Sequence, residues 1–203
     1  MKSLSEIDTV SKRASRASGF EWGIAEEVGK NTRTSEMLGI PAIKNLNHYY
    51  KVRNNKNFEK IKLLSEENKK TQLEYCPIIA GVNFLDQVRS LEILNVIKFY
   101  NMAYPMLFLP FVNRASEVIG KKILLEIDNS KFLLNYNKSL YCNSLNNGIV
   151  TIGNYISIKF LENTDLFEEN EWKELYKLSE NTFVEENDSL KKSGAGAGLT
   201  DND

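Results

Sequence analysis

The sequence contains little of the chemistry that most catalytic and metal sites use. Among its 203 residues, histidine occurs once, at His48, and cysteine twice, at Cys76 and Cys142. A zinc site or a histidine triad is therefore not predicted, and two cysteines without metal-ligand spacing predict reduced thiols rather than a disulfide framework. We expect His48 to be a half-buried packing residue and both cysteines to be unreactive buried thiols.

Long apolar runs and a dominant charge are also missing. The most apolar stretch, residues 104–112, contains two prolines and is far shorter than the ~20 residues that cross a bilayer. The polar opening Met1–Glu6 lacks the apolar core of a signal peptide. A formal net charge of -1 without a basic tract disfavours nucleic-acid binding. The expectation is a cytoplasmic protein that binds neither nucleic acid nor membrane.

The spacing of the apolar residues predicts an α+β fold. A Ser-x-x-Glu capping box at Ser3 and Glu6 starts the first helix, and Gly19, Gly39 and Gly120 are expected to end helices. The expected helices are 4–18, 21–38, one that starts at Pro41, a stretch around Phe58, Ile61 and Leu64, 110–118, and 171–181 with Trp172, Leu175 and Leu178 as anchors. The expected strands are 91–99, for which a helix is the alternative, a hairpin of 122–127 and 131–136, a strand at Tyr141, and 151–161.

The chain is expected to form one domain over residues 1–193. Its helical part covers residues 1–70 and packs on a small, mainly antiparallel sheet in the mixed part, residues 75–181. A carboxyl-terminal helix and a tail of glycine and alanine, residues 194–203, complete the chain.

Two glycines interrupt the second expected helix. Inside a helix a glycine destabilises by ~1 kcal/mol relative to alanine, so we expect Gly23 and Gly29 to serve close packing. The same helix spaces a carboxylate, an ammonium and a guanidinium at i, i+4 and i+7, in Glu26, Lys30 and Arg33. The small-residue face on which another backbone could lie consists of Ala25, Val28, Gly29 and Thr32.

This charged row has two interpretations. In an anion or carboxylate site, Arg33 would bind two oxygens, Lys30 would add a point charge and Glu26 would orient both. As surface salt bridges, the same residues would contribute only ~0.3 to 0.5 kcal/mol each. Arg114, which follows an apolar run, fits a structural carboxylate partner or a substrate carboxylate equally well.

The last ten residues form the other unusual segment. Glycine and alanine alternate, and a polar, acidic cap follows them. Such a backbone is either a loose tether or a strand that approaches another surface closely. The candidate docking residues are Gly194, Gly196, Gly198, Thr200, Asp201 and Asp203. The segment lacks the Lys-Ser/Thr ending of a phosphate loop and has too few oxygen ligands for a metal ion, so no metal is predicted.

Both segments resemble a known family. The matching residues are Gly19-x-x-Trp22-Gly23-x-Ala25-Glu26-Glu27-x-Gly29-Lys30-x-x-Arg33 and the terminal Gly-Ala-Gly-Ala-Gly-Leu-Thr-Asp-Asn-Asp. Together they are similar to a bacterial family of this length that is catalogued as a domain of unknown function. The resemblance supplies no activity and no catalytic residue, but it implies that the tail takes part in what the fold does.

Two functions from different classes follow. In the first, the chain is a binding or accessory protein whose tail docks in a groove of itself, a second copy or a protein partner, with its carboxylates on Lys30 and Arg33. In the second, it is a small-molecule enzyme in which the tail closes a pocket over an anionic substrate, with a glutamate, Glu26 or Glu27, as acid or base. The scarcity of histidine and cysteine favours binding; the sequence identifies no cofactor, substrate or partner.

Overall fold

The protein was analysed as a computed structural model that describes residues 2–69, 71–143 and 148–182. The chain divides into two units, residues 1–163 and 164–203. Each unit is described by itself, so the single domain over 1–193 stays a prediction. The α+β class is confirmed, because helices and one mixed sheet make up the described part of the chain.

The first unit contains most of the regular structure. Its helices are α1 (Leu4–Ala17), α2 (Trp22–Met37), α3 (Ala42–Arg53), α4 (Pro77–Leu91) and α5 (Leu109–Ile119), with a short 3-10 turn, η1 (Pro105–Leu107), before α5. Its strands are β1 (Glu67–Asn68), β2 (Ile97–Ala103), β3 (Ile123–Ile127), β4 (Ser130–Asn135), β5 (Ser139–Cys142) and β6 (Ile152–Phe160).

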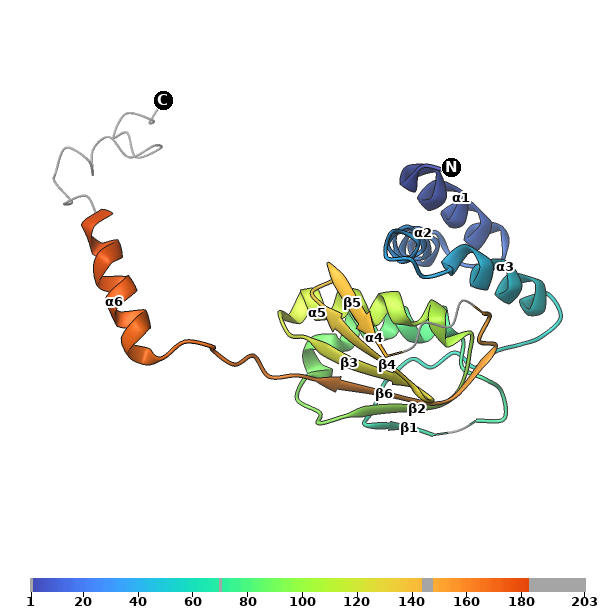
Figure 1. The fold of residues 1–203 in the computed structure, drawn as a ribbon. Helices are drawn as coiled ribbons and strands as arrows, with labels where there is room; N and C mark the ends of the chain where they lie inside the picture. The colour runs from blue at the N-terminus through green and yellow to red at the C-terminus, as the bar shows by residue number, and fades with distance from the viewer. Residues whose placement is uncertain (1, 70, 144–147, 183–203) are drawn as a thin grey trace, which may run out of the picture. The chain divides into compact units, whose positions relative to one another are not determined.

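The strands form one sheet in the order β1-β2-β6-β3-β4-β5 (Figure 1). β1 runs parallel to β2, and every other neighbouring pair is antiparallel, as expected. The turn of the predicted β3–β4 hairpin is tied to β6, because the Asp128 carboxylate accepts hydrogen bonds from the backbone of Asn154 at 3.1 Å and Tyr155 at 3.0 Å. The hairpin turn is therefore held against the neighbouring strand.

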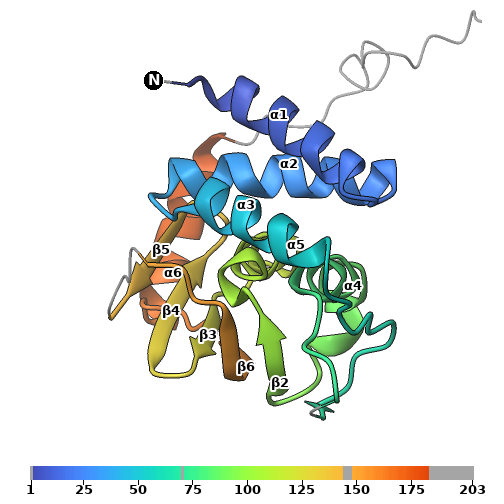
Figure 2. The ribbon, with the colours of Figure 1, turned by 90° about the vertical axis from the view of Figure 1, so that its right-hand side faces the viewer.

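Helices α4 and α5 cover one face of this sheet. Alternate strand residues such as Phe99, Leu125 and Ile158 are fully buried in one core with Phe84 of α4. A Cβ on Gly81 would lie 2.3 Å from the ring of Phe111, so the two helices pack at a distance that only glycine permits. Helices α1, α2 and α3 form a further layer, which reaches the sheet mainly through α4, α5 and η1 (Figure 2).

The opposite face of the sheet carries a polar row across five neighbouring strands. The paired positions are Glu67, Lys98, Ser157, Glu126 and Lys131. Lys98 and Lys131 each form an ion pair at 2.9 Å, with Glu67 and Glu126 respectively. Opposite charges facing across strands favour this strand order and disfavour slippage.

The predicted start and stop signals are largely confirmed. Ser3 caps α1 by accepting a hydrogen bond from the Glu6 backbone at 3.1 Å, although the Glu6 carboxylate bonds Lys2. Gly120 ends α5 with a φ of 66°. Local capping chemistry therefore determines these boundaries.

Two predictions in the centre of the chain are wrong. Residues 77–91 form α4, so the expected strand from Leu91 to Phe99 begins only at Ile97. The first six residues of α4, 77–82, are all apolar, which hides the helical period in this half of the helix.

The stretch around Phe58 is not a helix. Side chains of α4 bond its backbone instead, since Asn83 donates to the carbonyl of Ile61 at 2.6 Å and Gln87 accepts from the amide of Leu64 at 3.1 Å. These hydrogen bonds pair backbone carbonyl and amide groups of an irregular segment. In a helix, such groups would pair with one another.

The described part of the second unit contains α6 (Glu169–Ser179) and a 3-10 turn, Glu180–Thr182. The Glu168 and Glu171 side chains cap α6 reciprocally, and Trp172 stacks on Phe167. Within this unit α6 buries no residue, so Trp172, Leu175 and Leu178 do not anchor it there. None of the helices that the structure describes is long and apolar enough to cross a membrane.

Candidate functional site

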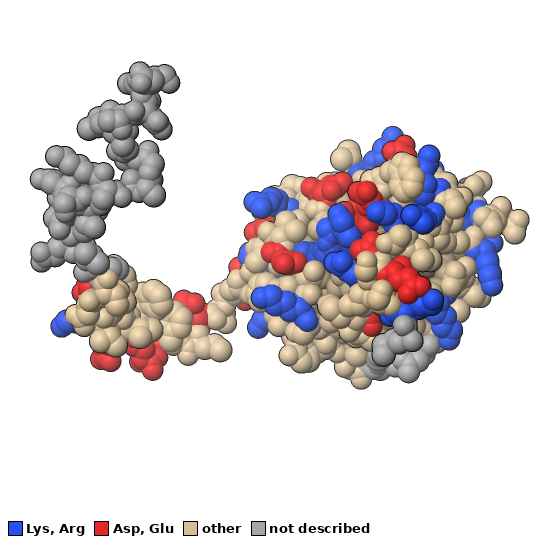
Figure 3. All heavy atoms as spheres, turned by 90° about the horizontal axis from the view of Figure 1, so that it is seen from above, with Lys and Arg blue, Asp and Glu red and all other residues tan. Residues whose placement is uncertain are grey.

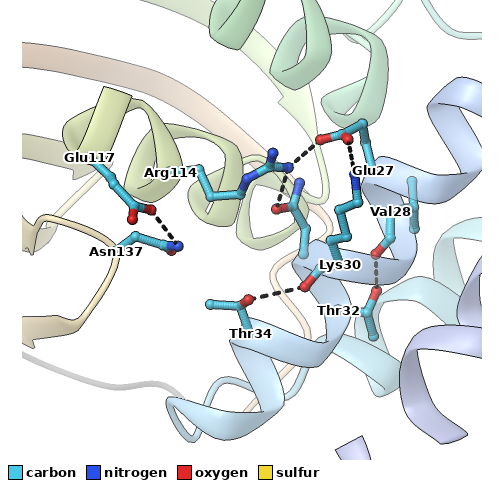
Figure 4. A network of polar contacts seen from close by, with 9 residues as sticks. Glu27, Val28, Lys30, Thr32, Thr34, Arg114, Glu117 and Asn137 are labelled. Carbon is cyan, nitrogen blue, oxygen red and sulfur yellow. Dashed lines mark hydrogen bonds and ion pairs between the residues drawn. The ribbon is translucent and has the colours of Figure 1, made fainter. Parts of the chain in front are cut away.

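A network of charged side chains connects α2 to α5 (Figure 4). Residues three and four positions apart share one side of a helix, which places Glu27, Lys30 and Asn31 of α2 together. Arg114 of α5 donates to the Glu27 carboxylate and to Oδ1 of Asn31, the latter at 3.4 Å. Lys30 Nζ lies 2.9 Å from the other Glu27 oxygen. Glu27 thus joins two cations from different helices.

The network favours the ionised form of Glu27. Partial burial by itself would raise the pKa of Glu27, but hydrogen bonds from Lys30 and Arg114 and the positive charges of both outweigh it, so the pKa is lowered. The Glu27 and Arg114 side chains are 23% and 24% exposed, whereas Lys30 is 49% exposed. The ion pair between Glu27 and Arg114 is therefore partly shielded from solvent. The Lys30 ammonium at its edge is available to a further anion.

The structure separates the residues that were predicted to act together. It brings Lys30 and Arg114 to one carboxylate, but that carboxylate belongs to Glu27 rather than Glu26. Arg33 lies 3.6 Å from Asp8 of α1, and Glu26 is exposed with no hydrogen bond or ion pair to any residue that the structure describes. One step along a helix turns a side chain by about 100°, so adjacent glutamates face different neighbours.

Four buried polar atoms lie on the elements that meet at this network. Each lacks a hydrogen-bond partner among the described residues: Nδ2 of Asn31, Oγ of Ser35, Oδ1 of Asn113 and Oδ1 of Asn135. The first two belong to α2, the third to α5 and the last to β4. A buried donor or acceptor without a partner destabilises by about 1–3 kcal/mol, so such a set calls for a water or a ligand.

The β4–β5 turn forms a second set of hydrogen bonds with α5. Asn113 donates to Oδ1 of Asn137 at 3.2 Å, and Asn137 donates to Glu117 at 3.1 Å. Asn137 adopts a φ of 59°, a left-handed conformation that asparagine tolerates better than most residues. This turn therefore holds the Asn113 side chain in place.

Sequence reasoning missed the asparagines and Ser35. Asn31 and Ser35 are four residues apart on α2, and Asn113 directly precedes Arg114, but asparagine is frequent throughout the chain. A polar residue at i and i+4 on an otherwise small-residue helix face was the available signal.

The two glycines of α2 have different surroundings. A Cβ on Gly29 would lie 2.7 Å from Oδ1 and 2.8 Å from the backbone oxygen of Asp8, so α1 packs closely on the small-residue face as expected. A Cβ on Gly23 would meet no atom within 4 Å. Close packing explains Gly29 but not Gly23.

The lone histidine and the cysteines lie outside the network. His48 is exposed rather than half-buried, and its Nδ1 lies 2.9 Å from the Tyr104 hydroxyl. Cys76 is fully buried beside the Tyr49 hydroxyl, and burial raises the pKa of its thiol, which fits the predicted lack of reactivity. Cys142 is only partly buried, which corrects that expectation.

The predicted docking residues of the tail lie outside the described residues. They are Gly194, Gly196, Gly198, Thr200, Asp201 and Asp203. Within the described residues, no group of three His, Cys, Asp or Glu side chains has the arrangement of a metal site.

The fold and the network define an α+β protein with a partly buried cation–carboxylate site between two helices. Residues 2–75 match the model of a family described as "Protein of unknown function (DUF3726)". The match covers the helical layer, including Glu27, Lys30 and Asn31, and ends before Arg114. No curated protein and no solved structure matches the chain.

Proposed function

We propose that this chain is a binding or accessory protein and that the site between α2 and α5 receives a carboxylate. The observation that carries the proposal is the Nδ2 atom of Asn31, a buried donor without a partner among the described residues, on a side chain that also contacts the Arg114 guanidinium. Lys30 and Arg114 together carry two positive charges against the single charge of Glu27. A second carboxylate beside the Lys30 ammonium and the Arg114 guanidinium would balance this excess.

The carboxylate that we assign to this site belongs to the tail of the chain, residues 194–203. Asp201, Asp203 and the terminal carboxylate supply negative groups within a few residues of one another. The glycines and alanines before them would let the backbone approach a narrow surface. Capture of a terminal carboxylate is a known mode of peptide recognition. Arg33 pairs with Asp8 of α1 at 3.6 Å, so the proposed site does not include it.

The tail that occupies this site comes from the same copy or from a second copy; docking of the tail in a groove of a protein partner is the other alternative that the sequence leaves open. A bacterial origin and a cytoplasmic location stay predictions from the sequence.

The test is binding of a labelled peptide with the sequence of residues 190–203. The receptor is the full chain with Asp201→Asn and Asp203→Asn, whose own tail competes weakly. We expect saturable binding that Arg114→Lys weakens about tenfold, because an ammonium cannot replace a bidentate guanidinium. Arg89→Lys, on the exposed side of α4, is the matched control. Absence of binding, or equal affinity in both arginine variants, would contradict the proposal.

The alternative is a small-molecule enzyme that acts on an anionic substrate, since Lys30, Arg114 and Glu27 combine cations with a carboxylate. The lowered pKa of Glu27 disfavours it, because a general base works best with a pKa near the operating pH. Thermal melts with inorganic phosphate and succinate distinguish the two functions. A rise in melting temperature that Arg114→Lys abolishes, in a protein that does not bind the peptide, would favour the enzyme.

A further inference from the structure

The outward side of α1 carries an acidic, an apolar and a basic residue in one stripe. Glu6, Val10 and Arg13 are spaced at i, i+4 and i+7 and are all exposed, Val10 by 59%. Figure 2 shows α1 at the outer edge of the helical layer. Glu6 and Arg13 are about 10 Å apart along the axis, at 1.5 Å per residue.

An apolar groove runs beside this stripe. It encloses about 170 Å³ between α1 and α3. Its apolar lining consists of Ile7, Val10, Ala14, Ile43 and Leu46, with Tyr50 at the side of α3. Ile43 is 37% exposed, and Leu4, one turn before Ile7, is 41% exposed. These residues form a small apolar patch beside the charged stripe.

The charges of the stripe complement the same stripe turned end to end. When a second α1 lies antiparallel to the first, with Val10 opposite Val10, each Glu6 faces the Arg13 of the other copy. Arg13 forms no hydrogen bond or ion pair with any residue that the structure describes. Glu6 pairs only with Lys2 among the described side chains, and both of these are well exposed. Two equivalent ion pairs would therefore flank one shared apolar centre.

We propose that this chain forms a two-fold symmetric dimer through α1 and α3. Such an interface is isologous: one patch meets its own copy, so each contact occurs twice. The order acid, apolar, base around a central valine is self-complementary, which favours a second copy over a foreign helix. Figure 3 shows basic and acidic side chains close together on the face of the first unit that it presents.

Charge reversal tests the antiparallel register. Glu6→Arg places two arginines opposite each other at both ends of the interface, and Arg13→Glu places two glutamates there. We expect each variant to raise the dimer dissociation constant on the order of tenfold in sedimentation equilibrium. An equimolar mixture of the two variants should dimerise like the wild type, because opposite charges again face each other when one copy carries Glu6→Arg and the other carries Arg13→Glu. A single chain that carries both Glu6→Arg and Arg13→Glu should also dimerise like the wild type.

Val10→Glu tests the apolar centre, with Val118→Glu as the matched control. Val118 is a 45% exposed valine on the surface of α5. Val10→Glu should give a monomer while Val118→Glu leaves the dimer unchanged, with equal far-ultraviolet circular dichroism for both. A wild type that stays monomeric up to ~100 μM would overturn the proposal and leave the groove to a foreign partner. A dimer that resists both charge reversals and Val10→Glu would also overturn it, because its interface would lie elsewhere.

Discussion

Individual side chains of α2 perform different tasks although they are adjacent in sequence. Glu27 joins α2 to α5, Arg33 joins it to α1, and Gly29 allows the backbone of α1 to approach. Most of the motif that drew attention in the sequence therefore connects helices. On the same helix, the Lys30 side chain is 49% exposed and the buried Nδ2 atom of Asn31 has no partner among the described residues.

The two glycines of α2 should respond in opposite directions to alanine. Gly29→Ala is expected to lower the free energy of unfolding by about 1–3 kcal/mol, because its Cβ meets a backbone oxygen of Asp8 that cannot move freely. Gly23→Ala should raise it by up to ~1 kcal/mol, because its Cβ meets nothing and alanine favours the helix. Urea denaturation of both variants measures the difference. Equal effects would mean that α1 does not pack closely on Gly29.

The contribution of Glu27 should depend on acid pH. Its pKa in the folded state lies below the ordinary value of 4.5, so its stabilisation is fully present above pH 4.5 and is lost as the pH falls through the folded pKa. Glu27→Gln is expected to destabilise by about 1–2 kcal/mol at neutral pH, discounted for partial exposure, and by less below pH 4. Glu26→Gln, which removes an exposed carboxylate without a partner among the described residues, is the control. A constant difference from pH 7 to pH 3 would contradict the assignment.

At the scale of elements, the sequence determines where a helix begins or ends wherever one residue has a conformational requirement of its own. Gly120 ends α5 at a positive φ, and Ser3 starts α1 through its hydroxyl. Helix α4 has a local start signal, because Pro77 stands in its first turn and the Cys76 sulfur accepts from the Ile79 amide, but the segment before it has none. Their structures depend on contacts between them, including the Asn83 and Gln87 side chains.

The end of α5 gives a graded test. Gly120→Ala is expected to destabilise by about 1 kcal/mol, because an L-residue with a Cβ is strained at a φ of 66°. Gly120→Asn should lose less stability than Gly120→Ala, since asparagine tolerates the left-handed region. Thermal melts of the two variants give the order. An alanine variant as stable as the wild type would show that this cap does not contribute.

At the scale of the whole molecule, the core belongs to the first unit. The buried apolar clusters consist of residues from Phe20 to Phe160. A chain that ends at Asn163 is therefore expected to melt cooperatively within a few degrees of the full chain, with the same near-ultraviolet circular dichroism. A large loss of stability would instead favour the predicted single domain over residues 1–193.

Much of the fold was predictable from the sequence, and less of the site. The α+β class, α1 to α3, α5, the β3–β4 hairpin and β6 follow from periodicity and capping residues. The site residues Lys30 and Arg114 were named, but their shared partner, Glu27, was assigned only as an alternative. A sequence does not show which helix faces Glu27, because α5 lies more than 80 residues away along the chain.

The sequence by itself determined where most elements begin and end, since caps, glycine stops and turn residues act within a few positions of the chain. Tertiary structure decided the rest. It made a helix of residues 77–91, left Phe58 to Leu64 without one, and separated Glu26 from Glu27. The physical reason is that burial and ion pairing depend on the neighbours that folding supplies, and these come from distant parts of the sequence.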